Sequence, residues 1–252
     1  MHRHTCATLI RGGVNVVGIV QCERSGPAAT LRFLKGRASR YGVLKTGGQI
    51  LGRIADRAVN AGLDRALLAT LIDGPADQVT IVRSGVPVLR TDSYSTPTTL
   101  SAIAGFDPDL FVVHTKFIVG RKVRALARVA VIGGHPGITP WFRGAYSAFW
   151  ALARGKPELV GWTVFLIDDG IDTGPIIAQG VLTAAGRVDS HNTLGWRGMT
   201  EQARVQTETI RALDRGETIA LRPIAEVPED SYFGPPTLLE FLRYRRTQLV
   251  AR

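Results

Sequence analysis

The chain has 252 residues, of which 45% are hydrophobic and 21% charged, and its formal net charge is +10. This is an ordinary globular composition, and the length suits one large domain or two small ones. No apolar run approaches the roughly eighteen residues of a spanning helix, so we expect no membrane partner. Two cysteines are too few for a disulfide framework, which favours a cytoplasmic location.

Arginine carries most of the positive charge. A basic surface attracts nucleic acid, anionic lipid or phosphorylated ligands. The sequence lacks zinc-ligand spacing, RNP-like aromatic patterns and heptads, so it favours neither nucleic acid nor a metal ion as a partner. The basic stretch from Arg32 to Lys45 keeps two interpretations open: a solvated surface, or a contact with a phosphate-bearing substrate.

Hydrophobic periodicity predicts strands and helices along the whole chain. In the first half it predicts a strand at 14–20, a loop or broken helix at 31–48, a helix at 50–71, a strand at 86–89 and a helix at 96–104. In the second half it predicts strands at 110–113 and 129–132, a helix at 145–153, strands at 160–167 and 176–182, and helices at 191–213 and 238–250.

Strands that alternate with helices predict an α/β fold, with a doubly wound, mostly parallel sheet and helices on both faces. In such sheets, ligands bind beyond the carboxyl ends of the strands. Two loops rich in glycine and polar residues follow predicted strands, one after Ile132 and one after Ile167. These loops are therefore the candidate functional site.

The first loop, Gly133 to Pro140, reads GGHPGITP. Its prolines and glycines force an irregular path that holds His135 at the edge of the sheet. A structural turn with a hydrogen-bonded histidine is the simplest alternative. A dinucleotide-binding loop is excluded, because Pro136 and Pro140 stand where the phosphate-binding helix would begin and the G-x-G-x-x-G spacing is absent.

The second loop, Asp168 to Pro175, reads DDGIDTGP and has three carboxylates. A solvated turn and a calcium loop are alternatives, but the EF-hand spacing is wrong. The run Asp172-Thr173-Gly174 also occurs in aspartic proteases. Those enzymes need two such loops, or a dimer of a much shorter chain, so the sequence disfavours a protease.

Together with the segment between them, the two loops read VIGGHPGITPWFRGAYSAFWALARGKPELVGWTVFLIDDGIDTGPIIAQ. This stretch resembles the formyltetrahydrofolate-dependent formyltransferases, a family that includes glycinamide ribonucleotide, methionyl-tRNA and sugar N-formyltransferases. The resemblance implies a Rossmann-like formyltransferase fold and 10-formyltetrahydrofolate as the formyl donor. It also implies an amine acceptor on a small molecule, such as a phosphorylated amino-sugar nucleotide.

The resemblance also predicts how the chain is organised. Residues 1–215 would form the catalytic domain, and residues 216–252 a C-terminal extension with a terminal helix. Relatives usually begin with a strand before the first helix. Here the stretch from Met1 to His4 resembles the start of that helix, so the first strand is expected to be missing. The oligomeric state stays open, with a homodimer among the alternatives.

The family's catalytic histidine and aspartate match His135 and Asp172. In such a site the histidine would stabilise the oxyanion that forms when an amine attacks the formyl carbon, and the aspartate would relay protons through water. The resemblance assigns the folate pterin to the second loop, through Asp168, Asp169, Gly170, Ile171 and Gly174. It assigns substrate positioning to Arg143 and Gly144.

The sequence departs from the family pattern at two places. Gly133 stands where the family has a catalytic asparagine, a donor whose loss typically costs roughly 10²–10³ in rate. Phe165 stands where many relatives have histidine. We therefore keep three interpretations: His114 or Lys116 supplies the missing donor and positions the substrate, the enzyme is slow, or the protein is a non-catalytic paralogue that binds folate or a partner.

Two related activities are disfavoured. Relatives that act on tRNA have a further C-terminal RNA-binding domain, for which the residues after Leu213 are too few. Formyl-folate hydrolases have an N-terminal regulatory domain that this sequence does not resemble.

Overall fold

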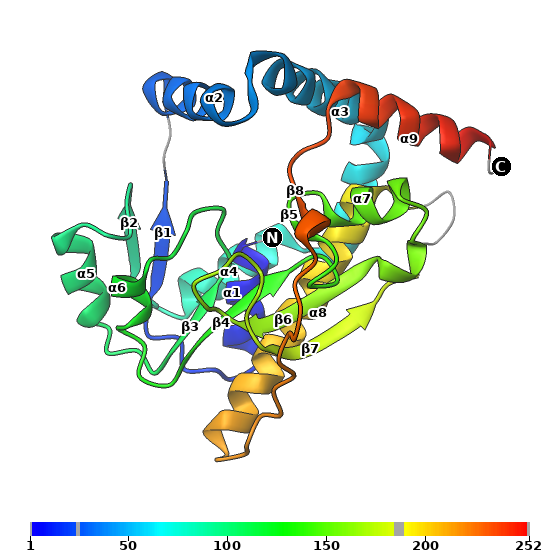
Figure 1. The fold of residues 1–252 in the computed structure, drawn as a ribbon. Helices are drawn as coiled ribbons and strands as arrows, with labels where there is room; N and C mark the ends of the chain where they lie inside the picture. The colour runs from blue at the N-terminus through cyan, green and yellow to red at the C-terminus, as the bar shows by residue number, and fades with distance from the viewer. Residues whose placement is uncertain (1, 24–25, 184–188, 251–252) are drawn as a thin grey trace.

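The computed structural model describes residues 2–23, 26–183 and 189–250, so Met1 of the predicted N-terminal helix lies outside the described residues. The helices in Figure 1 are α1 (His2–Arg11), α2 (Pro27–Tyr41), α3 (Val43–Leu71), α4 (Gly74–Arg83), α5 (Pro97–Ala104), α6 (Arg121–Arg124), α7 (Ser147–Ala153), α8 (His191–Asp214) and α9 (Leu238–Val250). The strands are β1 (Ile19–Cys22), β2 (Val88–Thr91), β3 (Leu110–Val113), β4 (Ala130–His135), β5 (Arg143–Gly144), β6 (Gly161–Leu166), β7 (Ile176–Val181) and β8 (Tyr232–Phe233). The 3₁₀ turns are η1 (Pro157–Leu159) and η2 (Glu229–Ser231).

Most of the predicted elements are present, and local signals explain their boundaries. β3 and α9 have the predicted bounds. α5 begins at Pro97, one residue later than predicted, because Thr96 is its N-cap: the Thr96 hydroxyl accepts a hydrogen bond from the Thr99 N–H. The basic stretch expected to be a loop or broken helix is two helices that meet at Gly42, whose φ of 81° interrupts the helical path.

The first predicted strand differs from the observed one. We expected it at 14–20, but β1 begins only at Ile19. Val14 and Val16 instead pack against the hydrophobic core beneath the main sheet. The first part of this apolar run therefore packs into a core, and only its last residues pair with another strand.

The main sheet contains four strands in the order β3-β4-β6-β7. β3 and β4 are parallel, whereas β6 runs antiparallel to β4 and β7. The loop between β6 and β7 is too short for a crossover helix, so these strands form a hairpin. Among the described residues, three of the five strand pairings are parallel. The predicted α/β, Rossmann-like class is therefore confirmed.

The direction of β6 determines where the second candidate loop leaves the sheet. We expected both loops at the carboxyl edge of parallel strands, and for the loop after Ile167 this expectation is wrong. His135 pairs with Thr163 and Ile132 pairs with Leu166. The second loop therefore leaves beside the beginning of β4 and must return along the sheet to reach His135.

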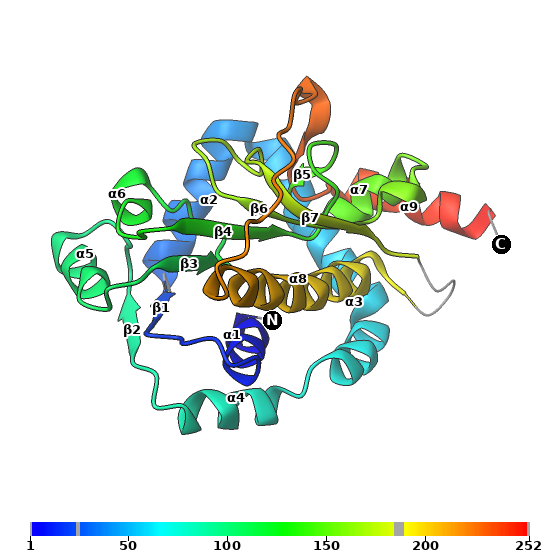
Figure 2. The ribbon, with the colours of Figure 1, turned by 90° about the horizontal axis from the view of Figure 1, so that it is seen from below.

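One face of the main sheet packs against α8, and Figure 2 shows α1 on the same side of the sheet. A core between sheet and helices contains the buried side chains Leu9, Ile132, Trp162, Val164, Val205 and Ile210. α8 begins at a capping box in which Ser190 and Thr193 each hydrogen-bond the other's backbone N–H. Burial of these apolar side chains provides the main driving force for packing the sheet against α8.

A second core ties the C-terminal residues to the rest of the chain. Phe142 stacks on Phe233 with ring centroids 5.4 Å apart, and the Trp150 indole N–H donates to the Gly234 carbonyl at 2.8 Å. Phe241 of α9 is buried in a cluster beside α7. In Figure 1, α2, α3 and α9 form the upper layer of the molecule, above the sheet. Within the described ranges, no helix is both long enough and apolar enough to cross a membrane.

Candidate active site

The structure brings His135 and Asp172 together. His135 is the last residue of β4 and is buried, with 3% of its surface exposed. Its Nδ1 atom lies 3.3 Å from Oδ2 of Asp172, whose side chain is 20% exposed. The pair therefore has one member enclosed by protein and one that solvent or a ligand can reach.

The other ring nitrogen of His135 is also engaged by the protein. Nε2 lies 2.6 Å from the Phe142 carbonyl and 2.9 Å from the Ser147 hydroxyl. A carbonyl oxygen only accepts hydrogen bonds, so Nε2 must carry a proton. Nδ1 faces the Asp172 carboxylate, so protein groups contact both ring nitrogens of His135.

Asp172 is held in place by its own backbone and by the strand beside it. Its φ of 54° is in the left-handed region, which aspartate tolerates better than most residues. Its Oδ2 atom accepts a hydrogen bond from the Gly144 N–H at 3.0 Å. A Cβ atom at Gly144 would lie 2.4 Å from the Phe233 carbonyl, so this donor position requires glycine.

Arg143 connects the second loop to the C-terminal segment. Its Nη1 atom donates to the Ile171 carbonyl at 3.1 Å, and its Nε atom donates to the Ser231 hydroxyl at 2.9 Å. The guanidinium therefore fixes the residue directly before Asp172. Arg143 and Gly144 together hold Ile171 and Asp172 in place.

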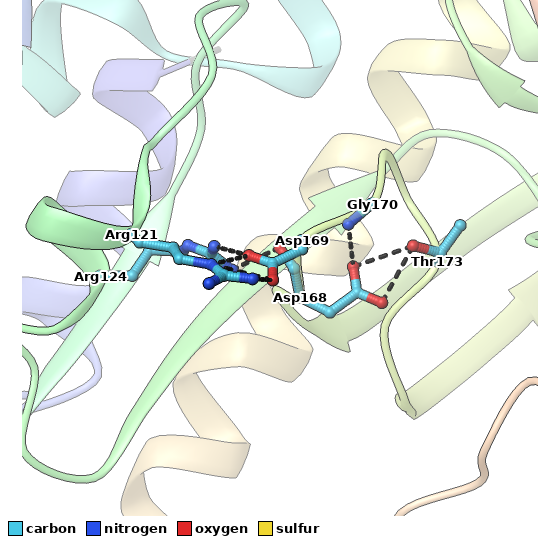
Figure 3. A network of polar contacts seen from close by, with 6 residues as sticks. All are labelled: Arg121, Arg124, Asp168, Asp169, Gly170 and Thr173. Carbon is cyan, nitrogen blue, oxygen red and sulfur yellow. Dashed lines mark hydrogen bonds and ion pairs between the residues drawn. The ribbon is translucent and has the colours of Figure 1, made fainter.

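Asp168 stabilises the second loop from within, as Figure 3 shows. Its carboxylate accepts hydrogen bonds from the Gly170 N–H at 3.0 Å and from the Thr173 hydroxyl at 2.9 and 3.0 Å. A Cβ atom at Gly170 would come within 1.9 Å of the Thr173 hydroxyl oxygen, so glycine is required there. The carboxylate of Asp168 is thus occupied by its own loop.

Asp169 points the other way and binds two arginines of α6 (Figure 3). Arg121 donates from Nε to both carboxylate oxygens at 3.0 Å, and Arg124 also donates to this carboxylate. Hydrogen bonds from Arg121 and Arg124 hold the pKa of Asp169 far below its usual range. Arg124 donates to the Asp168 carbonyl as well. These contacts anchor the loop to α6.

The first loop is anchored to β6 through Thr163, which is fully buried. The Thr163 hydroxyl donates to the Gly137 carbonyl at 2.7 Å and accepts from the Thr139 N–H at 3.2 Å. Gln179 of β7 donates to the Thr139 carbonyl at 2.8 Å. The hairpin that supports the second loop therefore also fixes the path that follows His135.

Gly133 and Phe165, which both depart from the family pattern, are neighbours on adjacent strands. They are register partners on β4 and β6. A Cβ atom at Gly133 would lie 3.0 Å from the Phe165 ring and 3.0 Å from the Ile167 side chain. The Phe165 ring thus fills the space that a side chain at position 133 would need, and a larger residue in place of Gly133 would displace that ring.

The structure places His114 on the other face of the sheet from His135 and leaves Lys116 on the surface. His114 bonds Gln206 of α8 through Nε2 at 2.8 Å, and burial lowers its pKa. Gly134 also faces Gln206, whereas Gly133 and His135 project to the opposite face of the sheet. Lys116 is exposed and lies over the Phe117 ring. His114 therefore faces away from the position of the missing asparagine.

Sequence reasoning missed several residues that build this site. Ser147 contacts His135, and Arg121 and Arg124 hold the second loop. Their only sequence signals were a serine near the start of a predicted helix and basic residues before a strand, and both are common features. Among the described residues, no group of three or more His, Cys, Asp or Glu side chains could hold a metal ion.

Comparison with known proteins gives one family. A sequence model described as "Formyl transferase" matches residues 52–210. The methionyl-tRNA formyltransferase of Synechocystis sp. is 28% identical over 167 residues, 66% of this chain and 49% of the relative. That of Anaeromyxobacter dehalogenans is 31% identical over 149 residues, 59% of this chain and 47% of the relative. The chain therefore spans about half the length of these curated relatives.

Solved structures are also similar. Glycinamide ribonucleotide transformylase 1 from Symbiobacterium toebii is 26% identical, with a TM-score of 0.48, over 59% of this chain and 74% of that chain. A 4-N formyltransferase from Francisella tularensis is 18% identical, with a TM-score of 0.46, over 63% of this chain and 62% of that chain.

Proposed function

The chain belongs to the formyl transferase family, and we propose that it transfers a formyl group from 10-formyltetrahydrofolate to an amine of a small-molecule acceptor. The contact between His135 and Asp172 carries this proposal. It unites a cation-forming ring and a carboxylate beside a loop whose backbone is rigidly held. Such a pair can handle both the charge and the proton that acyl transfer generates.

In the proposed reaction, the acceptor nitrogen attacks the formyl carbon and the carbonyl oxygen becomes an oxyanion. The positive charge of His135 stabilises that oxyanion. Asp172, the more exposed of the two residues, receives the amine proton through a water molecule. The bond from the formyl carbon to the folate nitrogen then breaks, and the proton returns to that nitrogen. Phe142 and Ser147 keep the imidazole oriented throughout.

We propose that the folate pterin binds along the second loop, residues 168–174. The carboxylates of Asp168 and Asp169 are already occupied by Thr173 and by the α6 arginines. Backbone groups of Asp168, Asp169, Gly170 and Gly174 would therefore contact the pterin. Ile171 is exposed and offers an apolar surface to its ring. The match to the family supports a formyl-folate as the donor.

The acceptor is proposed to be a phosphorylated amine, with Arg143 and Gly144 positioning it through the Asp172 loop and the exposed Lys116 as a further contact. His114 is left out of this proposal, because it binds Gln206 on the other face of the sheet. The curated relatives are named for methionyl-tRNA, and the chain spans about half their length. We propose further that residues 1–215 form the catalytic domain. Residues 216–252 would be an extension that completes it, because Ser231 holds Arg143.

The proposal is tested by mixing the protein with 10-formyltetrahydrofolate and a panel of amines while following tetrahydrofolate formation. We expect turnover with at least one phosphorylated amine. Asp172→Asn should lower it about 10²–10⁴-fold, since it removes the proton acceptor. Asp214→Asn, an exposed aspartate at the end of α8, is the matched control and should change nothing. Equal rates in the wild type and Asp172→Asn would refute the assignment.

The packing of Phe165 against Gly133 favours a second candidate, a member that binds folate without turnover. Calorimetry with 5-formyltetrahydrofolate separates the two. Binding without turnover across the panel supports the non-catalytic candidate, whereas the absence of binding at millimolar ligand contradicts both.

A further inference from the structure

α3 presents its polar residues to the protein and its apolar residues to solvent. The buried residues on its inner side are Thr46, Gln49, Gly52, Asp56 and Asn60. The exposed apolar residues on its outer side, here called the α3 stripe, are Val43, Leu44, Ile50, Leu51 and Ile54. Leu44 is 93% exposed and Val43 is 75% exposed. A helix on a globular protein normally shows the reverse arrangement.

The α3 stripe is continuous along the helix. Its members recur at intervals of three, four and seven residues, which places them on one side of a helix with 3.6 residues per turn. Ala58 and Ala61 continue the same side and are also exposed. Large apolar side chains left in water at this density usually mark a surface that contacts something else.

The helices that pack against α3 also expose apolar side chains. Leu31 and Phe33 of α2 and Leu239 and Leu242 of α9 are exposed. Figure 1 shows α2, α3 and α9 together as the upper layer of the molecule. We call this surface the α2–α3–α9 layer. It supplies apolar contacts along three helices.

The fully exposed charges of the layer have one sign, since its acidic residues Asp64 and Glu240 are half-buried and bonded to Ser190 and Thr237. Between Glu23 and Asp56 the sequence has no acidic residue. The exposed basic side chains in this part of the layer are Arg32, Lys35, Arg40, Lys45, Arg53 and Arg57. Asp56 itself is buried against His191. Arg243 and Arg246 of α9 are exposed as well. The layer therefore complements an anionic surface.

We propose that the α2–α3–α9 layer docks on the surface of a membrane that contains anionic lipids. Leu44, Ile54 and their neighbours would enter the boundary between headgroups and acyl chains. Arginine and lysine stems would lie along the same surface, with their cationic ends at the lipid phosphates. Stable peripheral binding takes two such signals, apolar insertion and cationic attraction, and this layer has both.

Other occupants fit the layer less well. A second copy of the chain would bring two basic surfaces together, which like-charge repulsion opposes. Nucleic acid would satisfy the arginines but would leave the α3 stripe in water. Peripheral docking needs no spanning helix, so it is compatible with the lack of one among the described residues.

Flotation of the intact protein with vesicles tests the proposal. Vesicles of equal parts phosphatidylglycerol and phosphatidylcholine should carry the protein upward, whereas phosphatidylcholine alone should not. Binding to the mixed vesicles should weaken as salt rises, because salt screens the cationic contribution. No flotation with the mixed vesicles at low salt would overturn the proposal.

Two sets of variants separate the two signals. Leu44→Asp with Leu51→Asp should lower the vesicle partition coefficient at least tenfold, since both changes remove apolar contact and add repulsion. The matched control is Val79→Asp with Val82→Asp, two exposed valines of α4, which packs on α1. Lys45→Gln, Arg53→Gln and Arg57→Gln together should lower partition about a hundredfold. Arg83→Gln, Arg90→Gln and Arg211→Gln, three exposed arginines outside the layer, are the charge control.

Circular dichroism first establishes that each variant is folded. Equal partition of a folded α3 variant and its control would overturn the proposal. Sedimentation equilibrium tests whether a second copy of the chain binds the layer. The proposal is also overturned if the wild type is a dimer, Leu44→Asp with Leu51→Asp converts it to a monomer, and neither form binds vesicles. Binding to an RNA oligonucleotide but not to mixed vesicles overturns it in favour of nucleic acid.

Discussion

Among the described residues, His135–Asp172 and His191–Asp56 are histidine–aspartate pairs with the same separation and different surroundings, whereas the pair His4–Asp77 is closer, at 3.0 Å. In both His135–Asp172 and His191–Asp56, ring nitrogen and carboxylate oxygen are 3.3 Å apart. Asp172 lies on a loop and is 20% exposed, whereas Asp56 lies inside the contact between α3 and α8 and is 7% exposed. Distance alone therefore does not distinguish a reactive pair from a structural one. The two pairs differ in how far solvent or a ligand can reach the carboxylate.

The second pair is closed on every side. Asp56 also accepts hydrogen bonds from Asn60 at 2.6 Å and from Asn192 at 3.2 Å. The rings of Phe149, Tyr146 and Tyr244 lie within 6.1 Å of the His191 ring, measured between centroids. No ligand can reach this carboxylate without separating helices. The pair joins α3 to α8, and its expected role is stability.

Removal of the Asp56 carboxylate should produce the largest loss of stability. Asp56→Ala leaves His191, Asn60 and Asn192 without their acceptor, and breaking a buried ion pair typically costs about 3–5 kcal/mol. Urea unfolding followed by circular dichroism measures this loss. Asp172→Asn, tested in the same way, should change the free energy of unfolding by less than about 1 kcal/mol, since Asp172 is partly solvated. Comparable losses in both variants would remove the distinction between the pairs.

The surroundings of His135 can be tested through its neighbours on the sheet. Gly133→Asn alone should destabilise the protein by about 1–3 kcal/mol, because its Cβ atom meets the Phe165 ring. Gly133→Asn with Phe165→His should recover much of that loss, since a smaller ring makes room. If the site is a weakened transferase, the double variant should raise turnover at least tenfold by supplying an oxyanion donor. Equal stability of the single and double variants would show that the two positions are not coupled.

The sequence predicted the contact of His135 with Asp172 but gave the wrong reason for it. We assumed parallel strands with both loops at one edge, whereas β6 is antiparallel and its loop returns along the sheet. The return depends on Arg143, Arg121 and Arg124, which lie far from the loop in sequence. Periodicity reports which residues are buried but not the direction of a strand, so this geometry could not be derived from it.

Other expectations failed because they concerned neighbours in space. The identity of Gly133 does not reveal that the Phe165 ring fills the space beside it. The apolar spacing from Ile50 onward correctly predicted a helix, but it did not predict that polar residues of α3 would be buried and apolar residues exposed. A periodic pattern identifies two sides of a helix but not which one is covered.

The smallest effect that we predict is a pH dependence that differs between the pairs. Burial by itself raises the pKa of Asp56, but hydrogen bonds from His191, Asn60 and Asn192, with the charge of His191, outweigh burial and hold that pKa below its ordinary value of 3.8. A carboxyl group with a lowered pKa stabilises the folded state above its unfolded pKa. It loses that contribution as pH falls through the folded value.

The free energy of unfolding should therefore fall below about pH 4, and part of the fall should belong to Asp56. Asp169 also has a lowered pKa, through its bonds to Arg121 and Arg124, so the wild-type curve alone does not isolate one group. The difference between wild type and Asp56→Asn does, because the asparagine cannot titrate. That difference should be constant above about pH 5 and shrink as pH falls further. Asp172→Asn is the comparison variant, and urea unfolding at a series of pH values is the measurement. A difference for Asp56→Asn that stays constant down to about pH 2 would mean that the buried pair adds no pH-dependent stability, and the contrast between the two pairs would then rest on access alone.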